Sequence, residues 1–159
     1  MNLESQVRAF LGEGKKRVAL LGVGETLRGD DGVGVKIIEL LVESALEDIL
    51  ILNTGSVPEA FTGKLVEHNS THVLLLDAAN FQGEPGDVKL IDSTRIGGQV
   101  ISTHNLPLTL FINYIEKVLG AKVRLLGVQP KYIGFKTELS QEVAEAAQEV
   151  AALLTKILS

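Results

Sequence analysis

Cysteine is absent from the 159 residues of this chain, and its absence excludes several kinds of chemistry. A protein without thiols has no disulfides, no thiolate metal ligands and no cysteine nucleophile. Aromatic residues are also scarce, at 4%, and tryptophan is missing. The core must therefore consist mainly of leucine, valine, isoleucine and alanine.

The sequence also lacks a basic cluster and a long apolar segment. Its formal net charge is −5, and its lysines and arginines are scattered, so neither nucleic acid nor an anionic membrane surface is an expected partner. No apolar run approaches the roughly 20 residues that span a bilayer, and residues 1–17 contain no signal-peptide core. We expect a monomeric, cytoplasmic protein without membrane insertion.

Alternating apolar runs and helical periodicities predict one α/β domain over residues 1–159. The order of the elements indicates a three-layer domain with a mostly parallel, twisted five-stranded sheet, one antiparallel strand, and helices on both faces. Ser56 is the expected N-cap of one helix. Strands are predicted at 17–24, 48–53, 71–79, within 81–92 and at 122–130, and helices at 3–11, 32–46, 57–68, from about 105 to 119, and at 139–158.

Acidic and polar residues follow the predicted strands at their carboxyl ends, where open α/β sheets bind their ligands. We expect these side chains to converge on one edge of the sheet. They are Glu25, Asp30 and Asp31 after the first strand, Asn53, Ser56 and Glu59 after the second, Asp77 at the end of the third, His104 and Asn105 beyond the fourth, and Gln129 after the fifth.

The glycine-rich stretch 22–34 occupies the place where many α/β proteins bind a phosphate. A dinucleotide fingerprint needs a third glycine where this chain has Leu27, and the G-K-[ST] of a P-loop is absent. Three carboxylates, Glu25, Asp30 and Asp31, would repel a phosphate by more than the roughly 0.3–1 kcal/mol that a helix dipole contributes. A nucleotide-binding domain is therefore a weak hypothesis.

The pair Asp30–Asp31 has two interpretations. In the first, a carboxylate caps the following helix, and Gly32 permits a tight turn. In the second, a carboxylate of the pair joins Asp77 and His104 in a site for a divalent ion such as nickel, zinc, iron or manganese. Such a site leaves coordination positions open for substrate or water, as catalysis requires. Ligand type alone does not identify the metal.

Five ordered segments resemble the hydrogenase maturation proteases, most closely the hydrogenase 3 type. These endopeptidases remove a C-terminal extension from the large subunit of a [NiFe]-hydrogenase after nickel insertion. The resemblance covers nearly the whole chain. The segments are LLGVGETLRGDDGVG (20–34), TGSVPE (54–59), LLLDAAN (74–80), STHNLPL (102–108) and LGVQPKYIGF (126–135).

The resemblance implies that Asp31, Asp77 and His104 contact a nickel ion. This ion would be carried by the large-subunit precursor rather than bound tightly by the free protein. A nickel-bound water could attack the peptide bond, or the metal could polarise the carbonyl, with Glu25 or Asp30 as base. The alternative function is a non-catalytic metal-binding or nickel-transfer accessory protein for hydrogenase assembly.

Two positions depart from the family pattern. Glu25 stands where the family usually has asparagine, and Asn53 where relatives of this type often carry aspartate. Glu25 lies beside the expected metal contacts, so this departure bears on the mechanism.

Overall fold

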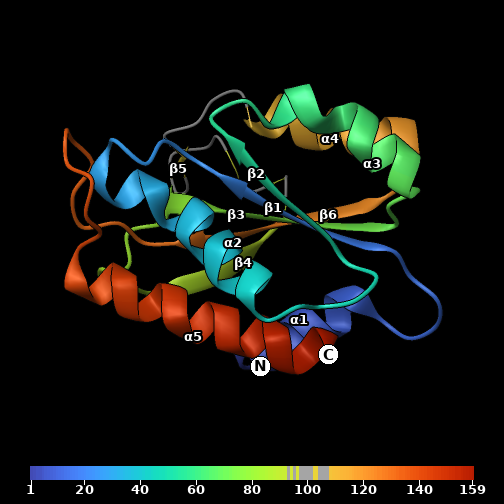
Figure 1. Ribbon diagram of the computed structural model, residues 1–159, viewed down its shortest axis with the longest axis horizontal. Helices are drawn as coiled ribbons and strands as arrows, with labels where there is room; N and C mark the ends of the chain where they lie inside the picture. Colours follow the sequence, from blue (N-terminus) through green and yellow to red (C-terminus); the bar gives the residue numbers. More distant parts are fainter. Residues whose placement is uncertain (93, 95, 97–101, 104–107) are drawn as a thin grey trace.

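A central sheet organises the chain in the computed structural model, which describes residues 1–92, 94, 96, 102–103 and 108–159 (Figure 1). The strand order is β2-β1-β3-β6-β4, and a short strand, β5, pairs antiparallel with the end of β3. Among the described strands of the main sheet, β4 alone runs antiparallel, and it forms one edge. The predicted fold class is therefore confirmed. The strands are β1 (Val18–Val23), β2 (Leu50–Gly55), β3 (His72–Asn80), β4 (Val88–Ile91), β5 (Ser102–Thr103) and β6 (Lys122–Val128).

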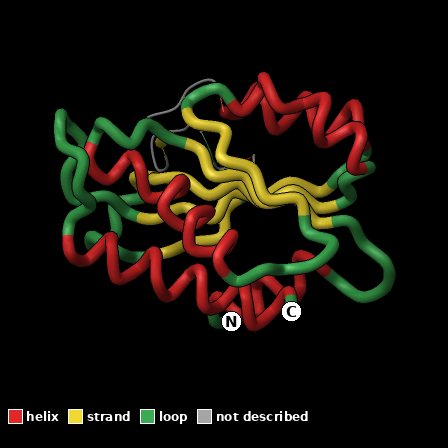
Figure 2. The backbone as a smooth tube through the Cα atoms, in the orientation of Figure 1, coloured by secondary structure: helices red, strands yellow, loops and turns green. Residues whose placement is uncertain are grey.

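Helices cover both faces of the sheet (Figure 2). One face carries α1 (Leu3–Leu11), α2 (Val33–Glu43) and α5 (Gln141–Leu158), and the other carries α3 (Thr62–His68) and α4 (Leu108–Leu119). Two 3₁₀ turns, η1 (Gly29–Gly32) and η2 (Pro58–Phe61), precede α2 and α3. Within the described ranges, no helix is long and apolar enough to cross a membrane.

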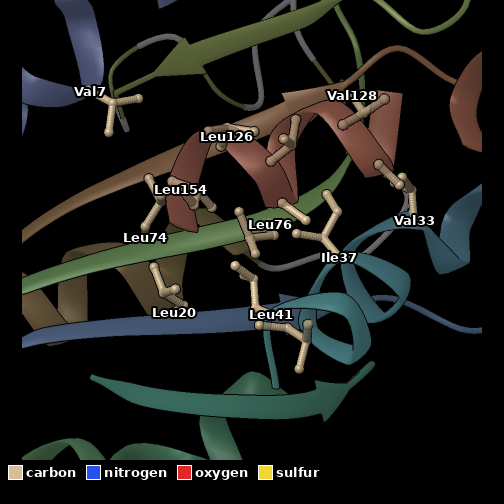
Figure 3. Packing of buried hydrophobic residues seen from close by; sticks show 14 of the residues in the cluster. Val7, Leu20, Val33, Ile37, Leu41, Leu74, Leu76, Leu126, Val128 and Leu154 are labelled. Atoms are coloured by element: carbon tan, nitrogen blue, oxygen red, sulfur yellow. The ribbon is translucent and has the colours of Figure 1, made fainter. Parts of the chain in front are cut away.

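Successive residues of the central strands enter two separate cores. Leu20, Leu74 and Leu76 pack towards α2 and α5 (Figure 3), whereas Leu21 and Leu75 pack towards α3 and α4. Side chains alternate across a strand, so a strand covered on both faces needs apolar residues at every position. This requirement explains the continuous apolar runs that predicted β1 and β3.

Element ends differ from the prediction where the backbone is left-handed. The helix predicted to reach residue 46 ends at Glu43, since Ala45 has a φ of 51°. The following strand starts at Leu50 rather than residue 48, where Asp48 has a φ of 61°. The expected N-cap at Ser56 is wrong, because η2 begins at Pro58 with Val57 as its N-cap and has no side-chain cap.

Glycines allow α2 to contact the sheet through backbone atoms. A Cβ atom on Gly34 would lie 1.9 Å from the carbonyl oxygen of Leu76 and 2.7 Å from that of Val23. A Cβ on Gly22 would lie 2.6 Å from the carbonyl oxygen of Gly34. The glycines of this motif therefore bring the start of α2 against the ends of β1 and β3.

Replacing Gly34 with alanine is expected to lower the free energy of unfolding by about 1–3 kcal/mol, because the added methyl group meets backbone that has no room to move. Gly63, in α3, is the matched control, since a Cβ there has nothing within 4 Å. Gly63→Ala should stabilise the protein by up to about 1 kcal/mol through helix propensity. Urea denaturation of both variants measures the difference, and an unchanged Gly34→Ala would contradict the packing argument.

Candidate functional site

Gly24 lies where three parts of the chain meet. It follows β1, has a φ of 137°, and donates its N–H to the carbonyl oxygen of Gly55 at the end of β2, at 2.9 Å. A Cβ at this position would lie 1.9 Å from the carbonyl oxygen of Asp31 and 3.4 Å from Oδ1 of Asp77. Both the left-handed backbone and these contacts require glycine.

Gly24 therefore lies between the backbone carbonyl of Asp31 and the carboxylate of Asp77, at the carboxyl edge of the sheet. Both aspartates are fully buried. Oδ2 of Asp31 accepts the backbone N–H of Glu25 at 2.9 Å, and Oδ1 of Asp77 accepts that of Ala78 at 2.8 Å. The two carboxylates come from neighbouring parallel strands, β3 itself and the turn after β1. This is the crevice in which open α/β sheets bind their ligands.

His104, the third expected metal contact, lies outside the described residues, as does Asn105. The segment immediately before it is anchored beside Asp77, because Thr103 of β5 pairs with Ala79 of β3. The described residues by themselves contain no group of three histidine, aspartate or glutamate side chains arranged for a metal ion. The complete trio thus stays a prediction.

Asp30 is also fully buried, but its carboxylate faces a different part of the protein. Oδ2 accepts the backbone N–H groups of Lys131 and Tyr132, at 2.8 and 2.9 Å, and the Ser140 hydroxyl at 2.8 Å. Oδ1 accepts the Ser140 N–H at 2.7 Å. Asp30 therefore ties the turn after β1 to the loop before α5.

These contacts argue against two roles for Asp30, that of a cap for α2 and that of a catalytic base. It does not cap α2, whose N-cap residue is Gly32 and has no side-chain hydrogen bond. To act as a base, the buried carboxylate of Asp30 would have to give up one of these four hydrogen bonds before it could accept a proton. The geometry supports a positioning role for Asp30.

Glu25 contacts the site through its backbone. Its N–H donates to Asp31, whereas its side-chain Oε1 accepts the N–H of Leu27 at 3.1 Å within the same turn. The contact with Asp31 is therefore available to any non-proline residue at this position. Glutamate at this position therefore leaves the contact intact.

Other candidates from the sequence hold local structure. Oδ1 of Asn53 accepts the N–H of Gly55 at 3.0 Å, at the end of β2. Oε1 of Gln129 accepts the N–H groups of Phe81 and Gly83, at 2.9 and 3.0 Å, and so fixes the turn after β3. Sequence reasoning missed the neighbouring Thr54, a buried residue whose hydroxyl donates to the Gly22 carbonyl at 3.1 Å.

A cavity of about 730 Å³ lies at the opposite end of the sheet. Its lining includes Lys16 and Val18 at the start of β1, Ile49 before β2, and Ile157 near the C-terminus. None of the predicted site residues contributes to it. The candidate site is the carboxyl edge with its buried carboxylates.

Comparisons with known proteins show which family the chain is similar to. A family model described as hydrogenase maturation protease matches residues 35–157. The hydrogenase 3 maturation protease of Escherichia coli strain K12 is 31% identical over 132 residues, which are 82% of this chain and 84% of that protein.

Two solved structures show a similar fold. The crystal structure of the [NiFe] hydrogenase maturation protease HycI from Thermococcus kodakarensis KOD1 has a TM-score of 0.83 and 38% identity, covering 91% of this chain and 94% of that one. The solution structure of the endopeptidase HycI from Escherichia coli has a TM-score of 0.76 and 28% identity, covering 85% and 86%.

The contacts of Asp30 predict a large cost for Asp30→Asn. The amide would direct an N–H group at backbone N–H donors, so we expect a loss of about 3 kcal/mol in the free energy of unfolding. Asp48→Asn is the control, because it removes the same charge from an exposed position with a left-handed φ that asparagine tolerates. Equal urea midpoints for the two variants would rule out the structural role of Asp30.

Proposed function

Since this chain belongs to the hydrogenase maturation protease family, we propose that it recognises its substrate through a nickel ion that the substrate already holds. The protein is an endopeptidase of hydrogenase maturation. The proposed substrate is the large-subunit precursor of a [NiFe]-hydrogenase, and the proposed reaction removes its C-terminal extension after nickel insertion. Nickel belongs to the substrate in this scheme, and the reaction takes place in the cytoplasm.

The observation that carries the proposal is a pair of fully buried aspartates beside Gly24, which Asp31 approaches through its backbone carbonyl and Asp77 through Oδ1. Carboxylates from two segments that meet at one edge of the sheet are ligands that a divalent cation can share. Carboxylate oxygens with an imidazole, from His104, are ligands that suit a divalent transition metal. A nickel ion presented by the precursor would satisfy this set.

A borrowed metal makes the reaction selective. The loaded precursor brings the ion that anchors it to Asp31, Asp77 and His104, whereas an empty precursor lacks this contact. The specificity of the enzyme is then set by how much more tightly it binds the loaded precursor than the empty one. Cleavage follows only when nickel insertion is complete.

The remaining chemistry needs a proton acceptor near the scissile bond. We assign this role to Glu25 rather than Asp30, because all the oxygens of Asp30 are engaged and buried, whereas Glu25 is partly exposed beside Asp31. The nickel ion would polarise the peptide carbonyl, and Glu25 would accept the proton of the attacking water.

Cleavage of nickel-loaded and nickel-free precursor, followed by intact mass measurement, tests the proposal. Asp31→Asn, Asp77→Asn and His104→Ala should each slow cleavage of the loaded precursor by roughly 100-fold or more, because each removes a metal contact. Asp48→Asn serves as the charge-matched control and should cleave at the wild-type rate.

Three outcomes would contradict the proposal. Equal cleavage of loaded and empty precursor would remove the role of nickel, and wild-type rates in the three variants would remove the role of the trio. A precursor that transfers its nickel but is never shortened would favour the accessory-protein alternative.

A further inference from the structure

Three large apolar side chains are exposed beside the candidate site. Phe135 is 88% exposed, Leu27 is 54% exposed and Tyr132 is 49% exposed. We call these residues the apolar rim. They belong to two segments far apart in the sequence, the turn after β1 and the loop between β6 and α5. Exposed apolar residues that cluster, unlike scattered ones, mark interaction surfaces.

Backbone contacts place the two segments of the rim side by side. Arg28 and Lys136 form a parallel bridge. The N–H of Lys136 donates to the carbonyl of Leu27 at 3.2 Å, and the N–H of Gly29 donates to the carbonyl of Lys136 at 2.7 Å. The Tyr132 ring lies over Gly29, where a Cβ would come within 3.2 Å of its Cδ1. The two segments that carry the apolar rim are therefore adjacent.

The loop that carries Tyr132 and Phe135 is held in place by the buried side chain of Asp30. Asp30 accepts four hydrogen bonds from residues 131, 132 and 140, and its own N–H donates to the Tyr132 carbonyl at 2.9 Å. A buried carboxylate thus fixes a loop whose apolar side chains face solvent. Surfaces fixed before binding lose little conformational entropy when a partner docks.

The same turn connects the rim to the carboxylate pair. Leu27 accepts the Lys136 N–H, and two residues earlier the Glu25 N–H donates to Asp31. In Figure 1, η1 and the loop that precedes α5 lie together at the end of the molecule where the strands β1 and β3 terminate. A polypeptide that reaches Asp31 therefore meets a surface continuous with the rim.

Charge at the rim indicates what kind of segment fits it. Nζ of Lys136 lies 6.0 Å from the centre of the Tyr132 ring, and within the described part of the chain Lys136 has no ion-pair partner. Lys131, by contrast, is paired with Glu142 at 2.9 Å. An apolar residue next to a carboxylate on the partner would complement both the rim and Lys136.

We propose that the apolar rim is a docking surface for the precursor polypeptide, separate from the metal contacts and acting together with them. This inference rests on the proposed function for the identity of the partner. Three side chains are too few for a stable dimer of this chain, which needs about 800 Å² from each partner. They suit the supporting part of an interface whose other part is the carboxylate pair.

Binding measurements separate the rim from the metal contacts. Phe135→Ser should weaken the affinity for nickel-loaded and nickel-free precursor by the same factor, at least about tenfold, because a buried aromatic anchor is lost from both complexes. Asp31→Asn should weaken binding of the loaded form alone. Leu110→Ser is the matched control, since Leu110 is 66% exposed but lies on α4, and it should bind as the wild type does.

Kinetics provide a second measurement on the same variants. Phe135→Ser should raise KM for the loaded precursor by a similar factor with kcat changed less than twofold, which is the signature of lost uniform binding. Unchanged affinity and KM in Phe135→Ser, or equal losses in Leu110→Ser, would overturn the docking role. So would a wild-type dimer in sedimentation that Phe135→Ser dissociates.

The docking role and the proposed function fail in different ways. If the wild type does not cleave loaded precursor but Phe135→Ser still loses affinity for it, the docking role stands and the proposed activity falls. If the wild type cleaves and Phe135→Ser binds normally, the activity stands and the docking role falls.

Discussion

The close approach of α2 to β1 and β3 is the constraint on which the candidate site depends. Gly22 and Gly34 leave no room for a Cβ between the helix and the strands, so the helix lies on the sheet backbone. As a result, η1, the 3₁₀ turn before α2, packs against the end of β3. Gly24 completes this contact, since the carbonyl of Asp31 and the carboxylate of Asp77 both lie against it. An acidic edge results where other α/β proteins have a phosphate cradle.

Adjacent aspartates in the turn have different surroundings, and the difference explains why the sequence needs both. Oδ2 of Asp31 accepts the N–H of Glu25 in the turn after β1, whereas the carboxylate of Asp30 is turned to the loop before α5. One residue belongs to the acidic edge, and the other holds a neighbouring loop beside it. A tight 3₁₀ turn makes this division possible, because successive side chains leave it about 120° apart.

Sequence alone predicted the parts of the fold that burial dictates. β1 and the middle of β3 are apolar because both faces are covered, and Asp77 could be placed at the carboxyl edge because it follows the apolar run of such a strand. The ends of α2 and β2 were missed because Ala45 and Asp48 adopt left-handed conformations that neither residue type signals. Single-residue backbone choices of this kind depend on tertiary packing.

The partners of Asp30 were not predictable for a related reason. Lys131 and Ser140 are 101 and 110 residues away from it in the sequence, in a loop without hydrophobic periodicity. This separation also has a consequence for biosynthesis. A growing chain contains Asp31 and Asp77 long before the ribosome has produced Ser140, so the turn at Asp30 lacks its partners until that later segment has been made. The acidic edge and the surface beside it therefore reach their final arrangement together, once the segment around Ser140 has joined the fold.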